Sequence, residues 1–270
     1  MADKNSNYEN LLEEAMKLYN FTEPKVEFIR HNENITYSII DRDKKYLLRI
    51  HKEAKGLDFS FYRGDINREI LIKSEIDLLN KLSKEKNIVV QTPVQNKNGK
   101  YVSCLEDGSF VTVLTWLDGE RLDSVEITKE LAFKMGEMTA RLHESYYTLP
   151  TFKRCVYDDV FIDKFIMEAK SAMELKHIKE VHYLEIRRVL KRLQDVLIKE
   201  KDNFVIIHYD FSKSNIIYSK ESVSPIDFSM FGYGIREMDL GGYLCMIEDS
   251  QLISSILEGY ESVSGYKINK

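Results

Sequence analysis

Two aspartates and an asparagine in the second half of the chain have the types and the order that phosphoryl transfer requires. Asp210 and Asn215 follow an apolar run that ends at Ile207, and Asp227 follows a second apolar run. In transfer from a magnesium nucleotide, one carboxylate accepts the hydroxyl proton of the acceptor, while an amide oxygen and another carboxylate hold the metal. Magnesium prefers oxygen ligands and retains several waters, so the nucleotide phosphates can complete its coordination. The order therefore predicts a magnesium-dependent phosphotransfer site.

Both aspartates follow β-branched apolar residues, so each half is predicted to be a short buried strand that ends in a polar loop. A lone His-x-Asp would be weak evidence. The pattern His-x-Asp-x-x-x-x-Asn over residues 208–215, followed by an apolar residue, Asp227 and Phe228, is specific. The alternative is a pair of polar loops in another α/β protein that carry aspartates by chance. Further kinase elements, which follow in order along the chain, favour phosphotransfer.

This pattern resembles the aminoglycoside phosphotransferase and choline kinase superfamily, and short motifs that match it run from Asn34 to Asp239. The resemblance implies an α+β, two-lobed protein-kinase-like fold, with an antiparallel sheet and one helix in the small lobe and a larger, mainly helical lobe. It implies an N-terminal nucleotide-binding lobe over residues 1–117 and a C-terminal catalytic and substrate-binding lobe over residues 118–270.

The resemblance also implies roles for the residues of the pattern. Asp210 is expected to be the catalytic base, and His208 is expected to hold the catalytic loop in shape. Asn215 and Asp227 are expected to bind Mg²⁺. ATP or GTP is the expected phosphate donor, and a hydroxyl group of a small molecule is the expected acceptor.

The composition fits an ordinary globular protein and argues against several classes. Of the 270 residues, 43% are hydrophobic and 31% are charged, which is enough apolar content for a sizeable core. The net charge of −5 argues against a nucleic-acid partner. Three separated cysteines without a C-x-x-C pair indicate neither zinc nor redox chemistry and fit a reducing compartment. Because no signal-like or membrane-spanning run is present, we expect a cytoplasmic protein without a membrane partner. The oligomeric state is not indicated.

The hydrophobic pattern of the first half of the chain predicts helices and strands, which fit the small lobe that the resemblance implies. Helical spacing predicts helices over residues 8–19 and 67–82, and apolar runs predict strands over residues 25–30, 35–40 and 45–50. The turn after the first strand contains no glycine, whereas kinases use glycines there to bring backbone N–H groups close to the phosphates.

Two residues of this half are candidates for binding the phosphates, and a third is a candidate partner for one of them. Asn34, with Tyr37, resembles the N-x-x-Y of the superfamily, so we expect phosphate contact from its turn. Arg49 stands late on the third strand, where kinases place a lysine that pairs with the phosphates, and its planar fork suits that task. By resemblance, Glu75 pairs with Arg49. Without the resemblance, a solvated edge-strand arginine and a solvated helix glutamate would be the simpler interpretations.

A strand over residues 110–117 is predicted to lead from the small lobe to the large one, after a hairpin turn at Asn98-Gly99. In the superfamily this crossing binds adenine through backbone groups. By position, the Thr115 carbonyl and the Leu117 amide would bond to the base, and Leu114 would face it. The alternative is a central strand followed by a turn.

The second half is predicted to be mainly helical, with helices over residues 131–143, 160–175, 181–198 and 252–260. Small-molecule kinases use helices of this region to form the acceptor pocket, and this is where they differ most. The acceptor therefore cannot be read from the motifs of the superfamily.

Several smaller expectations concern single residues. Asp239 resembles the aspartate that anchors the catalytic loop from a helix start, and it also fits a helix N-cap. His143 is expected to be structural. Asp158 and the aromatic residues beside it either bind a cationic acceptor or begin a helix, which is the commoner role. The loop over residues 56–65, with Phe59, either covers the active site or caps the small lobe.

These expectations combine into a phosphotransferase that moves the γ-phosphate of ATP or GTP to a hydroxyl of a small molecule. Aminoglycoside-type antibiotics lead as acceptors because the family is named for them, which would imply a role in antibiotic resistance. Choline, homoserine, another amino alcohol or a sugar fits as well. A catalytically silent kinase-like structural protein of spore-coat type is the alternative from another class, and a protein kinase is a third.

Overall fold

The computed structural model describes residues 2–56, 60–220 and 222–268. Phe59, in the loop predicted over residues 56–65, lies outside the described residues. Residues 60–63 of that predicted loop form a short helix instead.

The chain forms two compact units. The first comprises the chain up to Glu120 together with Ile217–Ser229, and the second comprises Arg121–Ile216 together with the chain from Met230. Their mixture of helices and antiparallel strands agrees with the predicted α+β class. The division into a nucleotide-binding lobe and a catalytic lobe at residue 117 concerns function and stays a prediction.

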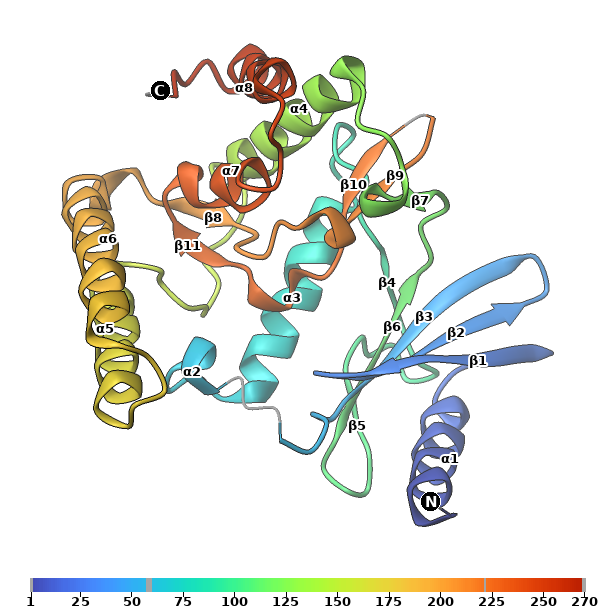
Figure 1. Cartoon of the computed structure of the whole chain (residues 1–270). Helices are drawn as coiled ribbons and strands as arrows, with labels where there is room; N and C mark the ends of the chain where they lie inside the picture. The colour runs from blue at the N-terminus through green and yellow to red at the C-terminus, as the bar shows by residue number, and fades with distance from the viewer. Residues whose placement is uncertain (1, 57–59, 221, 269–270) are drawn as a thin grey trace. The chain divides into compact units, whose positions relative to one another are not determined.

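An antiparallel sheet forms the centre of the first unit (Figure 1). Its strands follow in the order β1-β2-β3-β6-β4, and β5 also pairs with β6. The strands of this sheet are β1 (Pro24–His31), β2 (Ile35–Asp41), β3 (Lys44–His51), β4 (Pro93–Val94), β5 (Ser103–Cys104) and β6 (Phe110–Thr115). The three strands predicted at the start of the chain are therefore confirmed.

One face of this sheet packs against helix α1 (Ala2–Lys17). Ile35 and Ile39 of β2 form one buried cluster with Leu11 and Ala15 of the helix. Successive side chains of a strand point to opposite faces, so Thr36 lies on the other face of the sheet. The alternation in the sequence thus decides which face becomes the core and which remains available for a site.

Two further helices belong to the first unit, α2 (Ser60–Arg63) and α3 (Arg68–Leu82). Asn67 caps α3 because its side-chain oxygen accepts a hydrogen bond from the Glu69 amide at 2.8 Å. Helix α3 contacts β4, which lies beside it in Figure 1. The helix predicted over residues 67–82 is therefore confirmed, and α1 and α2 accompany it.

The predicted turn at Asn98-Gly99 is present. Gly99 has a φ of +73°, and the Asn96 amide donates to the Lys100 carbonyl at 2.8 Å. In the described sheet, β4 and β5 each pair with β6 rather than with each other. The predicted turn is therefore confirmed, but the predicted hairpin is wrong, because the described strands on either side of the turn both pair with β6.

Helices make up most of the second unit, together with two short antiparallel strands. All four helices predicted for this half of the chain are present. The elements are α4 (Lys129–Ser145), α5 (Asp159–Glu174), α6 (Glu180–Lys199), α7 (Arg236–Leu244), α8 (Ser250–Ser264), β8 (Val205–Ile207) and β11 (Gly232–Gly234).

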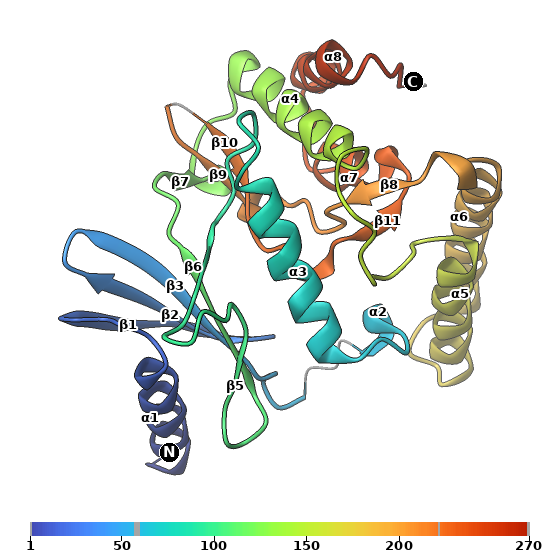
Figure 2. The ribbon, with the colours of Figure 1, turned by 180° about the vertical axis from the view of Figure 1, so that it is seen from behind.

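Helices α4 and α8 lie side by side and approach each other at two glycines (Figures 1 and 2). A Cβ on Gly136 would lie 1.9 Å from the Ile256 carbonyl oxygen, and a Cβ on Gly259 would lie 2.0 Å from the Phe133 carbonyl oxygen. Only glycine permits this spacing. The close contact fixes α8 against α4.

A small sheet in the order β10-β9-β7 leads the chain to the second aspartate of the pattern. Its strands are β7 (Glu120–Arg121), β9 (Ile216–Tyr218) and β10 (Val223–Pro225). Short 3₁₀ turns cover Leu122–Ser124, Lys201–Asn203, Lys213–Asn215 and Phe228–Met230.

No helix among the residues that the structure describes is both long and apolar enough to cross a bilayer.

Candidate functional site

The loop that follows β8 is held by a buried aspartate of α7. The Asp239 carboxylate accepts hydrogen bonds from the backbone amides of His208 and Tyr209, each at 2.7 Å. Asp239 has no exposed surface. Anchoring of the loop by Asp239 is therefore confirmed, whereas the N-cap role is wrong. The N-cap of α7 is Ile235, because the helix begins one residue later, at Arg236.

A histidine and a tyrosine extend this anchor. His143 Nε2 lies 3.0 Å from Asp239 Oδ2, and His143 Nδ1 lies 2.8 Å from the Tyr260 hydroxyl. All three side chains are buried, and burial raises the pKa of Tyr260, so its hydroxyl keeps its proton. His143 is structural, as expected, and it supports the loop through Asp239, a contact that the sequence did not predict.

Backbone strain is concentrated next to the predicted base. Tyr209 has a φ of +69°, which is uncommon for a residue with a side chain. Its ring stacks on that of Tyr157 with centroids 3.6 Å apart and planes within 2°. The His208 ring stacks on Phe211 at 4.4 Å. These ring contacts, together with the two hydrogen bonds from backbone amides to Asp239, support the strained loop.

Asp210 and Asn215 are in direct contact. The Asn215 amide nitrogen donates to Asp210 Oδ2 at 2.8 Å and to the Asp210 carbonyl at 3.0 Å. These bonds orient the exposed Asp210 carboxylate. They use the nitrogen of Asn215, so its side-chain oxygen remains the atom that can bind a metal.

Asp227 belongs to the first unit and has a φ of +65°. Its Oδ1 atom is buried and has no hydrogen-bond partner among the described residues, and its Oδ2 lies 3.4 Å from Arg30 Nη2. A buried carboxylate oxygen without a donor is costly unless a cation binds it. The Asp227 Oδ1 atom therefore fits as a ligand of the magnesium ion that the resemblance implies. No cluster of three or more His, Cys, Asp or Glu residues occurs in the described parts of the chain, so other oxygens must complete a metal shell.

Arg49 and Glu75 form the ion pair that was predicted. Arg49 Nη1 donates to Glu75 Oε1 at 2.8 Å, and the two side chains are only 6% and 4% exposed. Burial alone would lower the pKa of Arg49, but the charges of Glu75 and Asp227 raise it above its usual value. Arg49 Nε and Nη2 are buried without a hydrogen-bond partner among the described residues. Two parallel N–H groups of an arginine match two oxygens of a phosphate.

The turn after β1 carries Asn34, which is half buried. Its carbonyl accepts from the Asn32 amide at 3.3 Å and lies 3.5 Å from Thr36 Oγ1. The Asn32 carbonyl in turn accepts from the Ala54 amide at 2.7 Å. These bonds shape the turn, and phosphate contact by Asn34 stays a prediction.

The residues predicted to bind adenine do not share one described pocket. Leu114 is buried, and the Thr115 carbonyl already accepts a hydrogen bond from Gln91 Nε2 at 3.1 Å. Leu117 lines a pocket of about 490 Å³ whose other residues are Val89, Trp116, Asp118, Ser219, Lys220, Ser222 and Ser224. The contact of Gln91 with Thr115 was missed because a lone glutamine carries no motif. The adenine-binding roles stay predictions.

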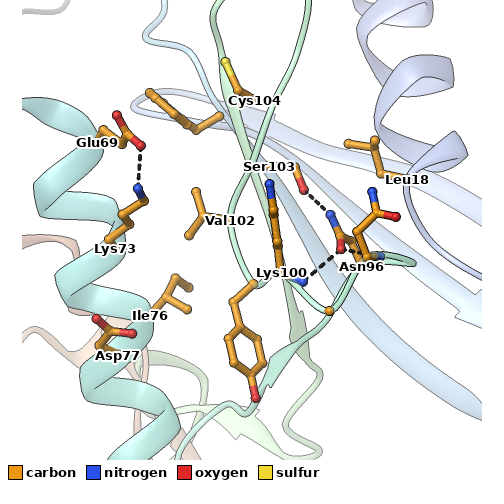
Figure 3. Close-up of a pocket in the computed structure, with 14 residues that line it drawn as sticks. Leu18, Glu69, Lys73, Ile76, Asp77, Asn96, Lys100, Val102, Ser103 and Cys104 are labelled. Atoms are coloured by element: carbon orange, nitrogen blue, oxygen red, sulfur yellow. Dashed lines mark hydrogen bonds and ion pairs between the residues drawn. The ribbon is translucent and has the colours of Figure 1, made fainter.

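A larger pocket of about 620 Å³ lies between α3 and the segment over residues 96–104 (Figure 3). Glu69, Lys73, Ile76 and Asp77 form the helix side of this pocket, and Figure 3 shows Glu69 paired with Lys73. At 100° per residue these positions share one face of α3, and Glu75 projects from a different face. No residue predicted for the phosphotransfer site lines this pocket.

Comparison with known proteins gave a family and one curated relative. A model described as the phosphotransferase enzyme family matches residues 25–267. Amicoumacin kinase of Bacillus subtilis (strain 168) is 25% identical over 239 residues, which cover 83% of this chain and 64% of that protein. The chain therefore spans a little less than two thirds of the length of this relative.

Solved structures share the fold at low sequence identity. Amicoumacin kinase hAmiN, in complex with AMP-PNP, Ca²⁺ and Ami, superposes with a TM-score of 0.71 at 20% identity, over 94% of this chain and 77% of that chain. A microcompartment-associated aminopropanol kinase superposes with a TM-score of 0.64 at 20% identity, over 94% and 80%. The predicted kinase-like fold is confirmed by this likeness.

Proposed function

Because the chain belongs to the phosphotransferase enzyme family, we propose that it transfers the γ-phosphate of ATP or GTP to a hydroxyl group of a small molecule. One observation in the first unit carries the proposal. Among the residues that the structure describes, two buried nitrogens of Arg49 have no hydrogen-bond partner, and neither does a buried oxygen of Asp227, whose charge acts on Arg49. An anion that carries its own divalent cation satisfies both groups at once, and a magnesium nucleotide is such a ligand.

The residues of the anchored loop are assigned to the acceptor. Asp210 orients the acceptor hydroxyl and accepts its proton as the oxygen attacks phosphorus. The hydrogen bond from Asn215 keeps the Asp210 carboxylate in place. His208, stacked on Phe211, keeps the loop in shape. Positioning of this kind supplies much of the rate in phosphoryl transfer.

The nucleotide and the metal are assigned to the remaining residues. Arg49, held by Glu75, pairs with phosphate oxygens, and Asn34, Leu114, Thr115 and Leu117 contact the nucleotide. The Asn215 side-chain oxygen and the Asp227 carboxylate bind Mg²⁺. When bound, the metal offsets charge on the phosphates. Residues 1–117 then act as the nucleotide-binding lobe and residues 118–270 as the catalytic lobe.

The acceptor is proposed to be a small molecule that carries an amino group beside its hydroxyl. The names of the relatives support this class, because aminopropanol is an amino alcohol. An aminoglycoside-type antibiotic remains the leading acceptor, with a role in antibiotic resistance and a cytoplasmic location as parts of the same proposal. A catalytically silent protein is disfavoured, since unpartnered buried groups cost stability unless a ligand uses them.

Release of ADP or GDP tests the proposal. The protein is incubated with magnesium-ATP or magnesium-GTP and a panel of aminoglycosides, amino alcohols and sugars, and Asp210→Asn serves as the blank. We expect at least one acceptor to stimulate release by the wild type and not by the variant. A flat panel together with no binding of either nucleotide would favour the silent, structural alternative.

A further inference from the structure

Arg30, on β1, lies on the same face of the sheet as Arg49. In the strand register, Arg30 stands opposite Thr36, and Thr36 stands opposite Arg49. Residues directly opposite each other on antiparallel strands project from the same face. Arg30, Thr36 and Arg49 therefore form one row across three strands, on the face that α1 does not cover.

An irregularity in β1 creates this row. The register shifts between Phe28, which pairs with Tyr37, and Arg30, which pairs with Thr36, so Ile29 is an extra residue. In a regular strand, Ile29 would stand opposite Thr36, and Arg30 would stand opposite Ile35 on the face that packs against α1. A one-residue bulge redirects the side chains that follow it. The bulge thus places the positive charge of Arg30 on the face of the sheet that carries Arg49.

Arg30 is held only loosely in this position. Its Nη2 lies 3.4 Å from Asp227 Oδ2, with the arginine side chain 55% exposed and the aspartate side chain 22% exposed. A long, exposed ion pair contributes little to stability, so a competing ligand displaces it easily. Asp227 is the residue to which the proposed function assigns the metal.

The turn beside Arg30 lacks the usual means of binding phosphates. Residues 31–34 contain no glycine, so close approach of several backbone amides is not favoured there. The turn instead carries Glu33, whose negative charge acts on Arg49 and on Arg68. A glutamate repels phosphate, and a second cation on this face offsets that repulsion.

We propose that Arg30 is a second polyphosphate-binding arginine, which pairs with Asp227 while the site holds no nucleotide and turns to phosphate oxygens when the metal-nucleotide binds. This inference rests on the proposed function. The ligand class is a nucleoside di- or triphosphate with its divalent cation. Arg30 replaces, with one side chain, the phosphate contacts that a glycine-rich turn makes with its backbone.

Calorimetric titration with adenosine, ADP and ATP, or with the guanine series where GTP is the donor, tests the proposal. Arg30→Gln is expected to weaken ADP and ATP binding about tenfold and to leave nucleoside binding unchanged, since only the phosphates contact Arg30. Arg30→Lys restores part of the loss, because the charge returns without the planar fork. Lys25→Gln, which removes one exposed positive charge from the same strand, is the matched control and should bind as the wild type does.

Binding of Mn²⁺ to the nucleotide-free protein, followed by electron paramagnetic resonance, supplies a second readout. Arg30→Gln should bind Mn²⁺ at least as tightly as the wild type, because Asp227 loses a competing cation. A purely structural defect would instead weaken metal and nucleotide binding together. Unchanged ATP affinity in Arg30→Gln, beside clear binding by the wild type, would overturn this inference alone. Failure of the wild type to bind either nucleotide would overturn the proposed function as well.

Discussion

Asp239 holds the backbone of His208 from within helix α7, with Oδ2 2.7 Å from the amide nitrogen. The same oxygen lies 3.0 Å from His143 on α4, and His143 contacts Tyr260 on α8. Three helices are therefore tied to the backbone of one short loop. Because the carboxylate is fully buried, each of these bonds is protected from competition with water.

The substitution Asp239→Asn is expected to destabilise the protein by about 3 kcal/mol, since a buried charged acceptor of three hydrogen bonds becomes neutral and partly a donor. Urea denaturation measures this loss. Asp195→Asn makes the same chemical change at an exposed position of α6 and should leave the midpoint unchanged. A variant Asp239→Asn as stable as the wild type would show that the anchor is not needed for the fold.

Two glycine-to-alanine substitutions should have opposite effects on stability, because Gly136 lies in the contact between α4 and α8 and Gly241 lies in open space on α7. Gly136→Ala places a Cβ 1.9 Å from a carbonyl oxygen of α8 and should destabilise the protein by roughly 2–3 kcal/mol or more. Gly241→Ala, within α7, meets no atom within 4 Å and should stabilise the protein by about 0.5–1 kcal/mol. Thermal unfolding of both variants checks the pair, and equal shifts of Tm would contradict it.

Substitution of two glutamates of α3 should reduce the stability of the protein to very different extents. Glu75→Gln removes the carboxylate that pairs directly with the buried Arg49 and should cost about 3–5 kcal/mol of stability. Glu69→Gln removes an exposed i,i+4 pair with Lys73 and should cost less than about 1 kcal/mol. Denaturant titration distinguishes them. Comparable small losses would mean that water reaches Arg49 and replaces its partner.

The pH dependence of stability should contain a contribution from His51. Burial, followed by the charges of Arg49 and Arg68, holds the pKa of His51 well below its ordinary value. The folded protein keeps this side chain neutral, whereas the unfolded chain protonates it below pH of about 6.5. Stability from this residue is therefore present above that pH and is lost as the pH falls, by about 1.4 kcal/mol per pH unit.

Measurement of the unfolding free energy between roughly pH 7 and pH 5 tests this contribution. His51→Gln, which keeps a polar group beside the Thr112 hydroxyl 2.9 Å away, should show a smaller slope. His177→Gln, at an exposed position, should keep the slope of the wild type. The same slope in all three proteins would show that His51 is protonated in the folded state.

The regular elements and the chemistry of the motifs could be predicted from the sequence, because both depend on local pattern. The apolar run over residues 35–40 predicted strand β2, and the resemblance to the superfamily predicted the ion pair of Arg49 with Glu75 that the structure forms. The bulge at Ile29 could not be predicted, since the register of a strand depends on its partner.

Asp239 shows a second limit of what can be predicted from the sequence. Its link to the catalytic loop followed from the motif, but its capping role was wrong because the start of a helix depends on packing as well as on residue type. The contacts of Gln91 with Thr115 and of His143 with Asp239 join segments that are far apart in the chain. Such contacts follow from the tertiary fold, and no local pattern encodes them.

Direct detection of the phosphorylated acceptor tests the central claim, which is phosphate transfer with Asp210 as base. The acceptor that stimulates ADP or GDP release is incubated with the wild type and with Asp210→Asn, and the products are analysed by mass spectrometry. We predict an acceptor heavier by one phosphate group with the wild type, and a rate about 10²–10⁴-fold lower with the variant. Nucleotide hydrolysis without a phosphorylated acceptor, or equal rates for the two proteins, would contradict the account.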